Sequence, residues 1–163
     1  MFRNLIAAAM TTVLLSTASY AAFPDPIAKV NVSVDLASVT NKPAADRYVN
    51  LSADLNAAIT TILKDRLGSP GAEITVDISA VELSNSFTDA AGLADTHLVG
   101  LVNINDTVNN ANTRSFELTI DVNTIKGLLP ADTDMATMTA SGDLFYHTMV
   151  DAFAQNLVAE MDK

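Results

Sequence analysis

Two histidines and no cysteine limit the chemistry that this 163-residue chain can perform. Without a thiol there is no cysteine nucleophile, and two histidines cannot form a multi-histidine zinc site. His147 precedes Asp151 by one helical turn, a spacing that suits either an oriented general base or an exposed i,i+4 pair. We favour the exposed pair. His97 opens a predicted strand, and we likewise expect it to have no catalytic role.

Other sequence signals of catalysis or cofactor binding are also missing. The chain has no glycine-rich phosphate loop, no serine nucleophile elbow and no His-Glu helix motif. Asp132-Thr133-Asp134 lacks the further oxygen ligands and the glycine of a calcium loop, so we interpret it as a solvated turn. The sequence therefore predicts no catalytic residue, no cofactor-binding residue and no metal ligand, and we expect the protein not to be an enzyme.

The charge balance narrows the classes of partner. There are 9 basic and 19 acidic residues, which gives a net charge of −10. No basic stripe or cluster interrupts this excess, so nucleic acid and anionic lipid headgroups are poor partners. The acidic residues, mostly Asp, are spread along the chain, which favours a role in solubility over a cation-binding site.

The first 21 residues have the order of features found in a secretory signal peptide. Arg3 provides the positive start, an uncharged apolar run covers residues 5–15, and Ser19-Tyr20-Ala21 provides small residues for cleavage before Ala22. The apolar run is shorter than the ~20 residues of a membrane span, and lipid attachment would need a cysteine. We expect residues 22–163 to form a single domain in the bacterial periplasm or medium, with no membrane-spanning segment after cleavage.

Apolar periodicity in the remainder predicts four strands and two helices. Strands are expected from Val30 and over about 74–80, 98–104 and 116–122, where apolar and polar residues alternate. Three- and four-residue apolar steps predict helices over about 43–67 and from Ser141 to about 161. Residues 124–140 stay open between a turn, a short edge strand and a cover for the sheet.

This order predicts an α+β fold, with a single four-stranded mixed sheet (β-α-β-β-β-α) and both helices packed on one face. The helical crossover should make the first strand parallel to the second. Pairing residue 80 with 100, and residue 104 with 116, places apolar residues opposite one another. The same register brings Ala80 beside Gly100, where the alanine-rich segment 53–58 of the first helix would fit closely.

Four aliphatic residues interrupt the otherwise polar face of the predicted sheet. They are Val81, Leu83, Val99 and Leu101. Because exposed apolar groups that cluster on a surface often mark contact sites, we interpret these four as a partner-binding patch. Two alternatives stay open: a β-bulge near Ala80 that returns residues 81 and 83 to the core, or coverage by residues 124–140.

The arrangement of blocks resembles small periplasmic proteins of the ABC-transport auxiliary lipoprotein type. A helix over residues 52–67 is followed by "AEITVDISAVELSNSF", "THLVGLVNINDT" and "RSFELTIDV", and "GDLFYHTMVDAFAQNLVAEM" closes the chain. The resemblance covers about residues 27–161 and lies in pattern, so no functional residue is carried over. It implies a role in export or envelope maintenance, but the lipidated cysteine of that family is absent here.

Two classes of function follow from the sequence. The first, which we favour, is a non-enzymatic periplasmic binding or assembly module, auxiliary to envelope transport or maintenance, with a protein partner or self-association. The second is a small secreted hydrolase or ligand-binding enzyme with a dispersed site. Convergent carboxylates in a pocket would favour the second class, and a shallow surface with one apolar patch would favour the first.

Overall fold

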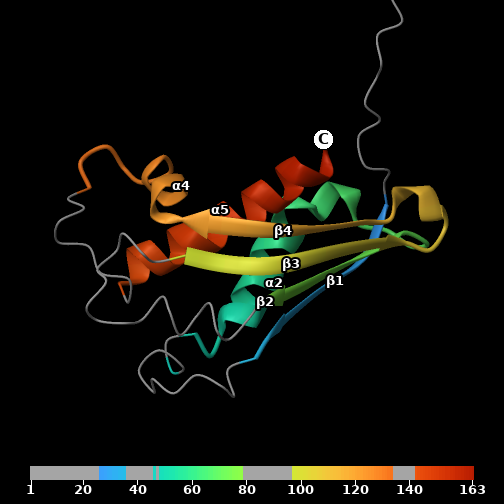
Figure 1. Cartoon of the computed structure of the whole chain (residues 1–163), viewed down its shortest axis with the longest axis horizontal. Coiled ribbons are helices and arrows are strands. Elements are labelled where there is room, and N and C mark those ends of the chain that lie inside the picture. The colour runs from blue at the N-terminus through green and yellow to red at the C-terminus, as the bar shows by residue number, and fades with distance from the viewer. Residues whose placement is uncertain (1–25, 36–45, 47, 79–96, 134–141) are drawn as a thin grey trace, which may run out of the picture.

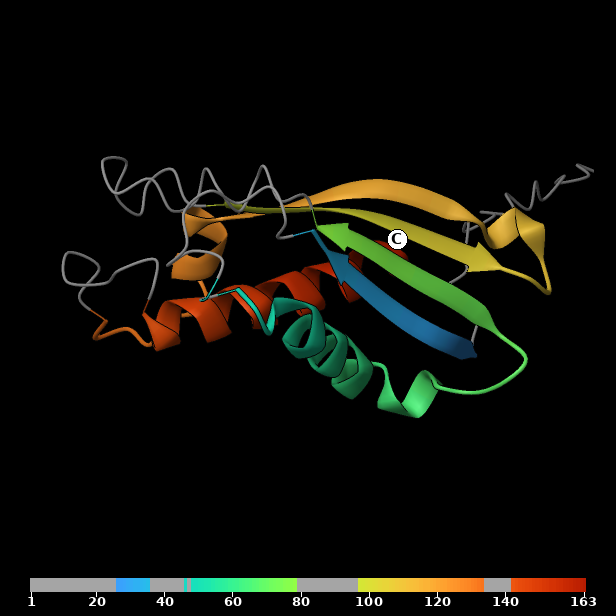
Figure 2. The same ribbon diagram turned by 90° about the horizontal axis from the view of Figure 1, so that it is seen from below.

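A four-stranded sheet with helices on one face forms the framework of the protein (Figures 1 and 2). The computed structural model describes residues 26–35, 46, 48–78, 97–133 and 142–163. Its elements are β1 (Ile27–Val34), α2 (Leu51–Ile62), the 3₁₀ helix η1 (Lys64–Arg66), β2 (Ala72–Ile78), β3 (His97–Asp106), the 3₁₀ helix η3 (Asn110–Asn112), β4 (Arg114–Asp121), α4 (Val122–Lys126) and α5 (Asp143–Met161). The predicted α+β fold is confirmed. The predicted signal peptide lies outside the described residues.

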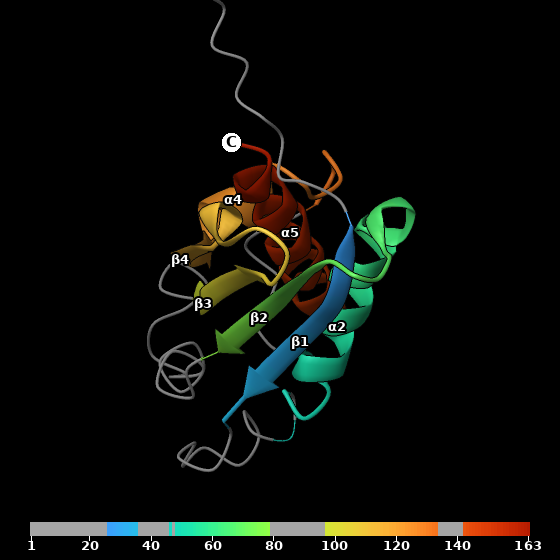
Figure 3. The same cartoon turned by 90° about the vertical axis from the view of Figure 1, so that its right-hand side faces the viewer.

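The strands follow one another across the sheet in the order β1-β2-β3-β4 (Figure 3). As predicted, β1 runs parallel to β2, and the other two pairs are antiparallel. The predicted registers were wrong by two residues. Gly100 opposes Ile78 rather than residue 80, and Ile104 opposes Arg114 rather than residue 116. A shift of two residues keeps every side chain on its predicted face.

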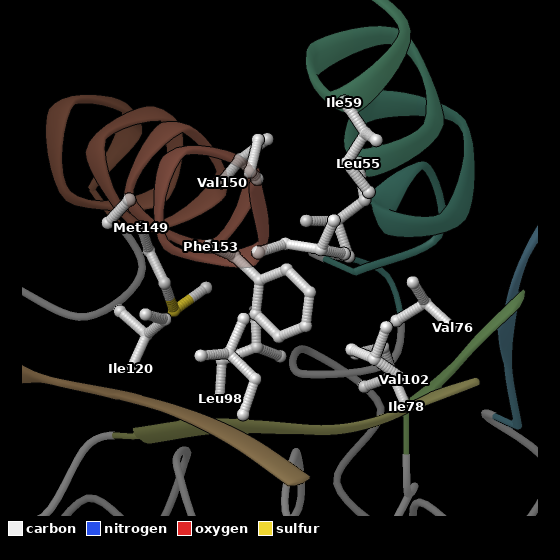
Figure 4. Packing of buried hydrophobic residues seen from close by; sticks show 14 of the residues in the cluster. Leu55, Ile59, Val76, Ile78, Leu98, Val102, Ile120, Met149, Val150 and Phe153 are labelled. Atoms are coloured by element: carbon white, nitrogen blue, oxygen red, sulfur yellow. The ribbon is translucent and has the colours of Figure 1, made fainter. Parts of the chain in front are cut away.

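Alternating burial shows which face of the sheet meets the helices. Along β2 every second residue is buried, starting from Ala72, and the residues between them are exposed. The buried side chains pack against the apolar stripes of α2 and α5, which also contact each other (Figure 4). Fully buried examples on the two helices are Leu55, Ile59, Phe145, Phe153 and Leu157.

Gly100 lies at a close approach between the sheet and α5. A Cβ atom at Gly100 would lie 2.7 Å from Cδ1 of Ile78 and 2.8 Å from Cζ of Phe153. A close approach at Gly100 was expected, but from the alanines of the first helix. Ala53 and Ala57 are instead exposed on α2, and the ring of Phe153 on α5 occupies the space.

Side chains from α2 cover the backbone of β1, which is one edge of the sheet. The Ser52 hydroxyl donates to the Val32 carbonyl at 2.6 Å, and the Asn56 amide nitrogen donates to the Val30 carbonyl at 2.8 Å. Because unpaired backbone groups on an edge strand attract other strands, these bonds protect this edge.

Element ends differ from the sequence-based expectations at three places. The first helix, expected over 43–67, covers Leu51–Ile62 and continues as η1; Pro43 lies outside the described residues. The last helix begins at Asp143, with Gly142 rather than Ser141 at its N-cap. Part of the open segment 124–140 completes α4, where the Asp121 carboxylate accepts a bond from the Thr124 amide at 2.8 Å.

Candidate functional site

The face of the sheet opposite the helices, which we call the outer face, is the candidate functional site. Its described side chains form rows across the strands. One row runs Ser33-Asp77-Leu101-Glu117, the next runs Asn31-Thr75-Asn103-Ser115, and a third joins Lys29 to Glu73 and Asn105. Val99 opposes Thr119, and His97 opposes Asp121. The outer face is therefore polar, with more acidic than basic side chains and with two aliphatic side chains on β3.

Leu101 is the apolar centre of the outer face. Its side chain is 47% exposed, and it lies between Asp77 on β2 and Glu117 on β4. Val99, two residues earlier on the same strand, is half-buried. The structure thus places two of the four predicted patch residues together on the outer face, while Val81 and Leu83 lie outside the described residues.

Hydrogen bonds within the rows hold several polar groups of the outer face in place. The Ser33 hydroxyl donates to Oδ1 of Asp77 at 3.2 Å, and the Ser115 hydroxyl donates to Oδ1 of Asn103 at 2.8 Å. Cross-strand pairs of this kind stabilise a sheet and fix side-chain directions. Both carboxylates beside Leu101 therefore project from strands rather than from loops, and that of Asp77 is held by Ser33.

The two histidines lie on different elements, His97 at the start of β3 and His147 on α5. His97 begins β3, as expected, and faces Asp121 across the sheet. The exposed ring of His147 packs edge-on against the ring of Tyr146, with centroids 5.3 Å apart. His147 and Asp151 are both exposed on α5, as expected, but no ion pair or hydrogen bond joins these two described residues. Tyr146 itself donates to Oδ2 of Asp54 at 2.6 Å and so links α5 to α2.

Asp106 is a buried carboxylate that sequence analysis did not single out. It ends β3, and its oxygens accept bonds from the amides of Val108 and Asn109 and from the side chain of Asn112, at 2.7–3.0 Å. The Asn112 side chain and the two amides lower the pKa of Asp106. An Asp before a polar loop is a known turn signal, so its role in closing this hairpin could have been recognised.

We expect acid to weaken the fold through Asp106 and Asp121. The amide and hydroxyl of Thr124 lower the pKa of Asp121 in the folded state, as the partners of Asp106 do for that residue. A carboxylate whose pKa is lower in the folded state stabilises the protein at every pH above its pKa in the unfolded state, here 3.8. That stabilisation is lost as the pH falls through the pKa of the folded state. The free energy of unfolding, measured by urea titration, should therefore decline from about pH 5 to pH 2.

The variant Asp106→Asn should show a shallower decline over this pH range, and Asn112→Ala should act in the same direction because it removes a donor to the same carboxylate. A decline as steep as that of the wild type in both variants would contradict the role of Asp106.

In the described part of the chain, a metal site would need a group of ligand side chains, and a membrane span would need a long apolar helix. No group of three or more His, Asp or Glu side chains there is arranged to hold a metal ion. Asp132 is exposed in a turn closed by a bond from the Thr133 amide to the Pro130 carbonyl, while Asp134 lies outside the described residues. None of the described helices is long and apolar enough to cross a membrane.

Comparisons with known proteins give a distant structural likeness. No family model matches the sequence, and no curated protein matches it. The chain is similar to a crystal structure described as that of "a putative lipoprotein" from Caulobacter crescentus, with 13% sequence identity and a TM-score of 0.39. The alignment covers 80% of this chain and 87% of that chain.

Proposed function

We propose that this protein is a non-enzymatic binding module of the bacterial periplasm, or of the secreted fraction, that holds a protein partner on its outer face. The observation that carries this proposal is the exposed Leu101 between Asp77 and Glu117. The location rests on the predicted signal peptide over residues 1–21. Within this class, a role auxiliary to envelope transport or maintenance remains a hypothesis based on the sequence resemblance.

The chemistry of the outer face indicates what the partner must present. An exposed leucine gains ~1.5–3 kcal/mol when it is fully buried, so the partner should offer an apolar side chain or pocket at Leu101. The acidic groups beside it, Asp77 and Glu117, favour lysine or arginine at the rim of the contact. A protein segment with a basic rim around an apolar centre meets both requirements.

The variant Leu101→Thr tests this proposal. Threonine is β-branched and favours strands, but it removes most of the apolar contact, so capture of the partner from an envelope extract should fall by about tenfold. The retained partner should be released by high salt, because screening weakens the contacts of rim charges. Both quantities are measured on the immobilised mature protein.

Val108→Thr is the matched control, because Val108 is 69% exposed but lies in the β3–β4 loop, away from the outer-face rows. Its capture should equal that of the wild type. Equal capture by Leu101→Thr and the wild type would contradict the proposal, provided that both unfold at the same temperature.

A further inference from the structure

The two edges of the sheet differ in how their backbone is protected. On β1, side chains of Ser52 and Asn56 bond to strand carbonyls. On the opposite side, β4 is the last strand, and β3 is its strand partner among the described residues (Figure 3). β4 is eight residues long and contains no proline, and its pairing with β3 shows no bulge. A regular edge strand of this kind is a template for pairing with another strand.

We propose that β4 pairs antiparallel with β4 of a second copy of this chain, about a two-fold axis at Leu118. For the core faces of the two sheets to join, even-numbered residues of one β4 strand must lie opposite even-numbered residues of the other, and odd-numbered opposite odd-numbered. With Leu118 opposite itself, Phe116 meets Ile120, Glu117 meets Thr119 and Ser115 meets Asp121. Apolar side chains then face apolar ones, and no like charges lie directly opposite each other.

Neighbouring registers are less favourable, and this selects the axis at Leu118. An axis at Glu117 would place the two copies of Glu117 opposite each other, and an axis at Thr119 would place Glu117 opposite Asp121. Like charges directly opposite on adjacent strands destabilise a sheet. The axis at Leu118 also overlaps residues 115–121 of both strands in full, and it covers Phe116, which is half-buried at the edge.

The pairing would join two sheets into one of eight strands and make the outer face continuous. Two copies of β3 would then be separated by three strand spacings, about 14 Å. The two Leu101 side chains would lie on the same surface at roughly this separation. A dimer of this kind would present the outer face twice to one partner, which would raise the apparent affinity for a partner with repeated segments.

Introduced cysteines test the register directly, because the native chain has none. Disulfides need Cβ atoms about 3.5–4.5 Å apart. Directly opposed residues come close to this distance, whereas diagonal neighbours are about 7–8 Å apart. An equimolar mixture of the Glu117→Cys and Thr119→Cys proteins, mildly oxidised and run on a non-reducing gel, should therefore give several-fold more disulfide-linked dimer than either variant alone.

Asn31→Cys, on the outer face of the protected strand β1, is the matched control, and its mixture with either variant should give only background dimer. Background dimer in the Glu117→Cys and Thr119→Cys mixture as well would overturn the proposed pairing. The wild-type protein should also behave as a dimer by light scattering, and a monomer at all concentrations tested would overturn the proposal.

A second pair of variants shows whether a loss of dimer comes from the β4–β4 contact itself or from a disturbed monomer. Thr119→Glu places a carboxylate opposite Glu117 at two symmetric contacts, which should raise the dimer dissociation constant by about tenfold. Mixing it with Glu117→Lys should restore dimers between the two proteins, because the new charges are then opposite in sign. Undiminished self-association of Thr119→Glu, or no recovery in the mixture, would contradict the register. Thr119→Glu alters neither Leu101 nor its carboxylate neighbours Asp77 and Glu117, so partner capture by this variant can fail or succeed independently of dimer formation.

Discussion

Replacement of Phe153 by Ala is expected to lower the free energy of unfolding by about 3–5 kcal/mol. Phe153 is fully buried on α5, and its ring lies over Gly100 among the apolar side chains of β2, β3 and α2 (Figure 4). Its removal would leave a cavity at the contact between the sheet and α5, because the glycine below has no side chain to fill the space. Urea unfolding monitored by circular dichroism measures the loss.

Two further variants show whether the effect arises from this contact. Gln155→Ala lies two residues further along α5 on an exposed position and should leave stability nearly unchanged. Gly100→Ala alone should cost about 1–3 kcal/mol, since its Cβ would overlap the Phe153 ring and Ile78. In the Phe153→Ala background the same change should cost less, because the overlap with the ring is gone and the end of the Ile78 side chain can shift into the cavity. Simple additivity of the two substitutions would show that ring and glycine are not coupled.

The sequence predicted the faces of the sheet more reliably than its register. Alternation along 74–78 and 98–104 determines which side chains point to the core, and the structure confirms these assignments. Apolar residues still oppose apolar residues after a shift of two positions, so the pattern alone could not choose between registers. For β3 and β4 the choice depends on their loop, where Asp106 accepts bonds from two backbone amides and from Asn112 and so fixes where the hairpin closes.

Long-range packing was the other feature that local patterns could not provide. The small residue at 100 predicted a close approach by a helix, and this expectation is confirmed. The two helices cover different parts of the core face of the sheet, and their positions decide which one approaches Gly100. α2 lies against β1, to which Ser52 and Asn56 bond. That position leaves the space over Gly100 to Phe153 of α5.

Part of the candidate site was predictable from the alternation of side chains along the strands. Because alternate residues of a strand point to opposite faces, Val99 and Leu101 were predicted on the polar face, and Leu101 is exposed there. Its carboxylate neighbours, Asp77 and Glu117, follow from strand pairing rather than from any sequence motif. Partner binding at this face remains a prediction, to be decided by the Leu101→Thr experiment.

Replacement of Gly71 by Ala should destabilise the protein by about 3 kcal/mol or more, because the added Cβ would meet backbone rather than side-chain atoms. Gly71 is buried just before β2, and its Cβ would lie 2.2 Å from the carbonyl oxygen of Pro26 and 2.7 Å from its carbonyl carbon. The same oxygen accepts a bond from the Ala72 amide at 3.0 Å, at the point where β1 and β2 begin to pair. Relief of the overlap would therefore require the strands to separate there.

Gly127→Ala is the matched control, and it should have the opposite sign. Gly127 ends α4 with helical backbone angles, and its Cβ would meet only the Thr124 carbonyl oxygen at 3.5 Å, an ordinary contact. Alanine at such a position restricts the unfolded chain and stabilises proteins by about 0.4–1 kcal/mol. Thermal unfolding of the two variants should thus move the midpoint in opposite directions. A Gly71→Ala protein as stable as the wild type would show that the β1 and β2 strands do not approach each other this closely at Pro26.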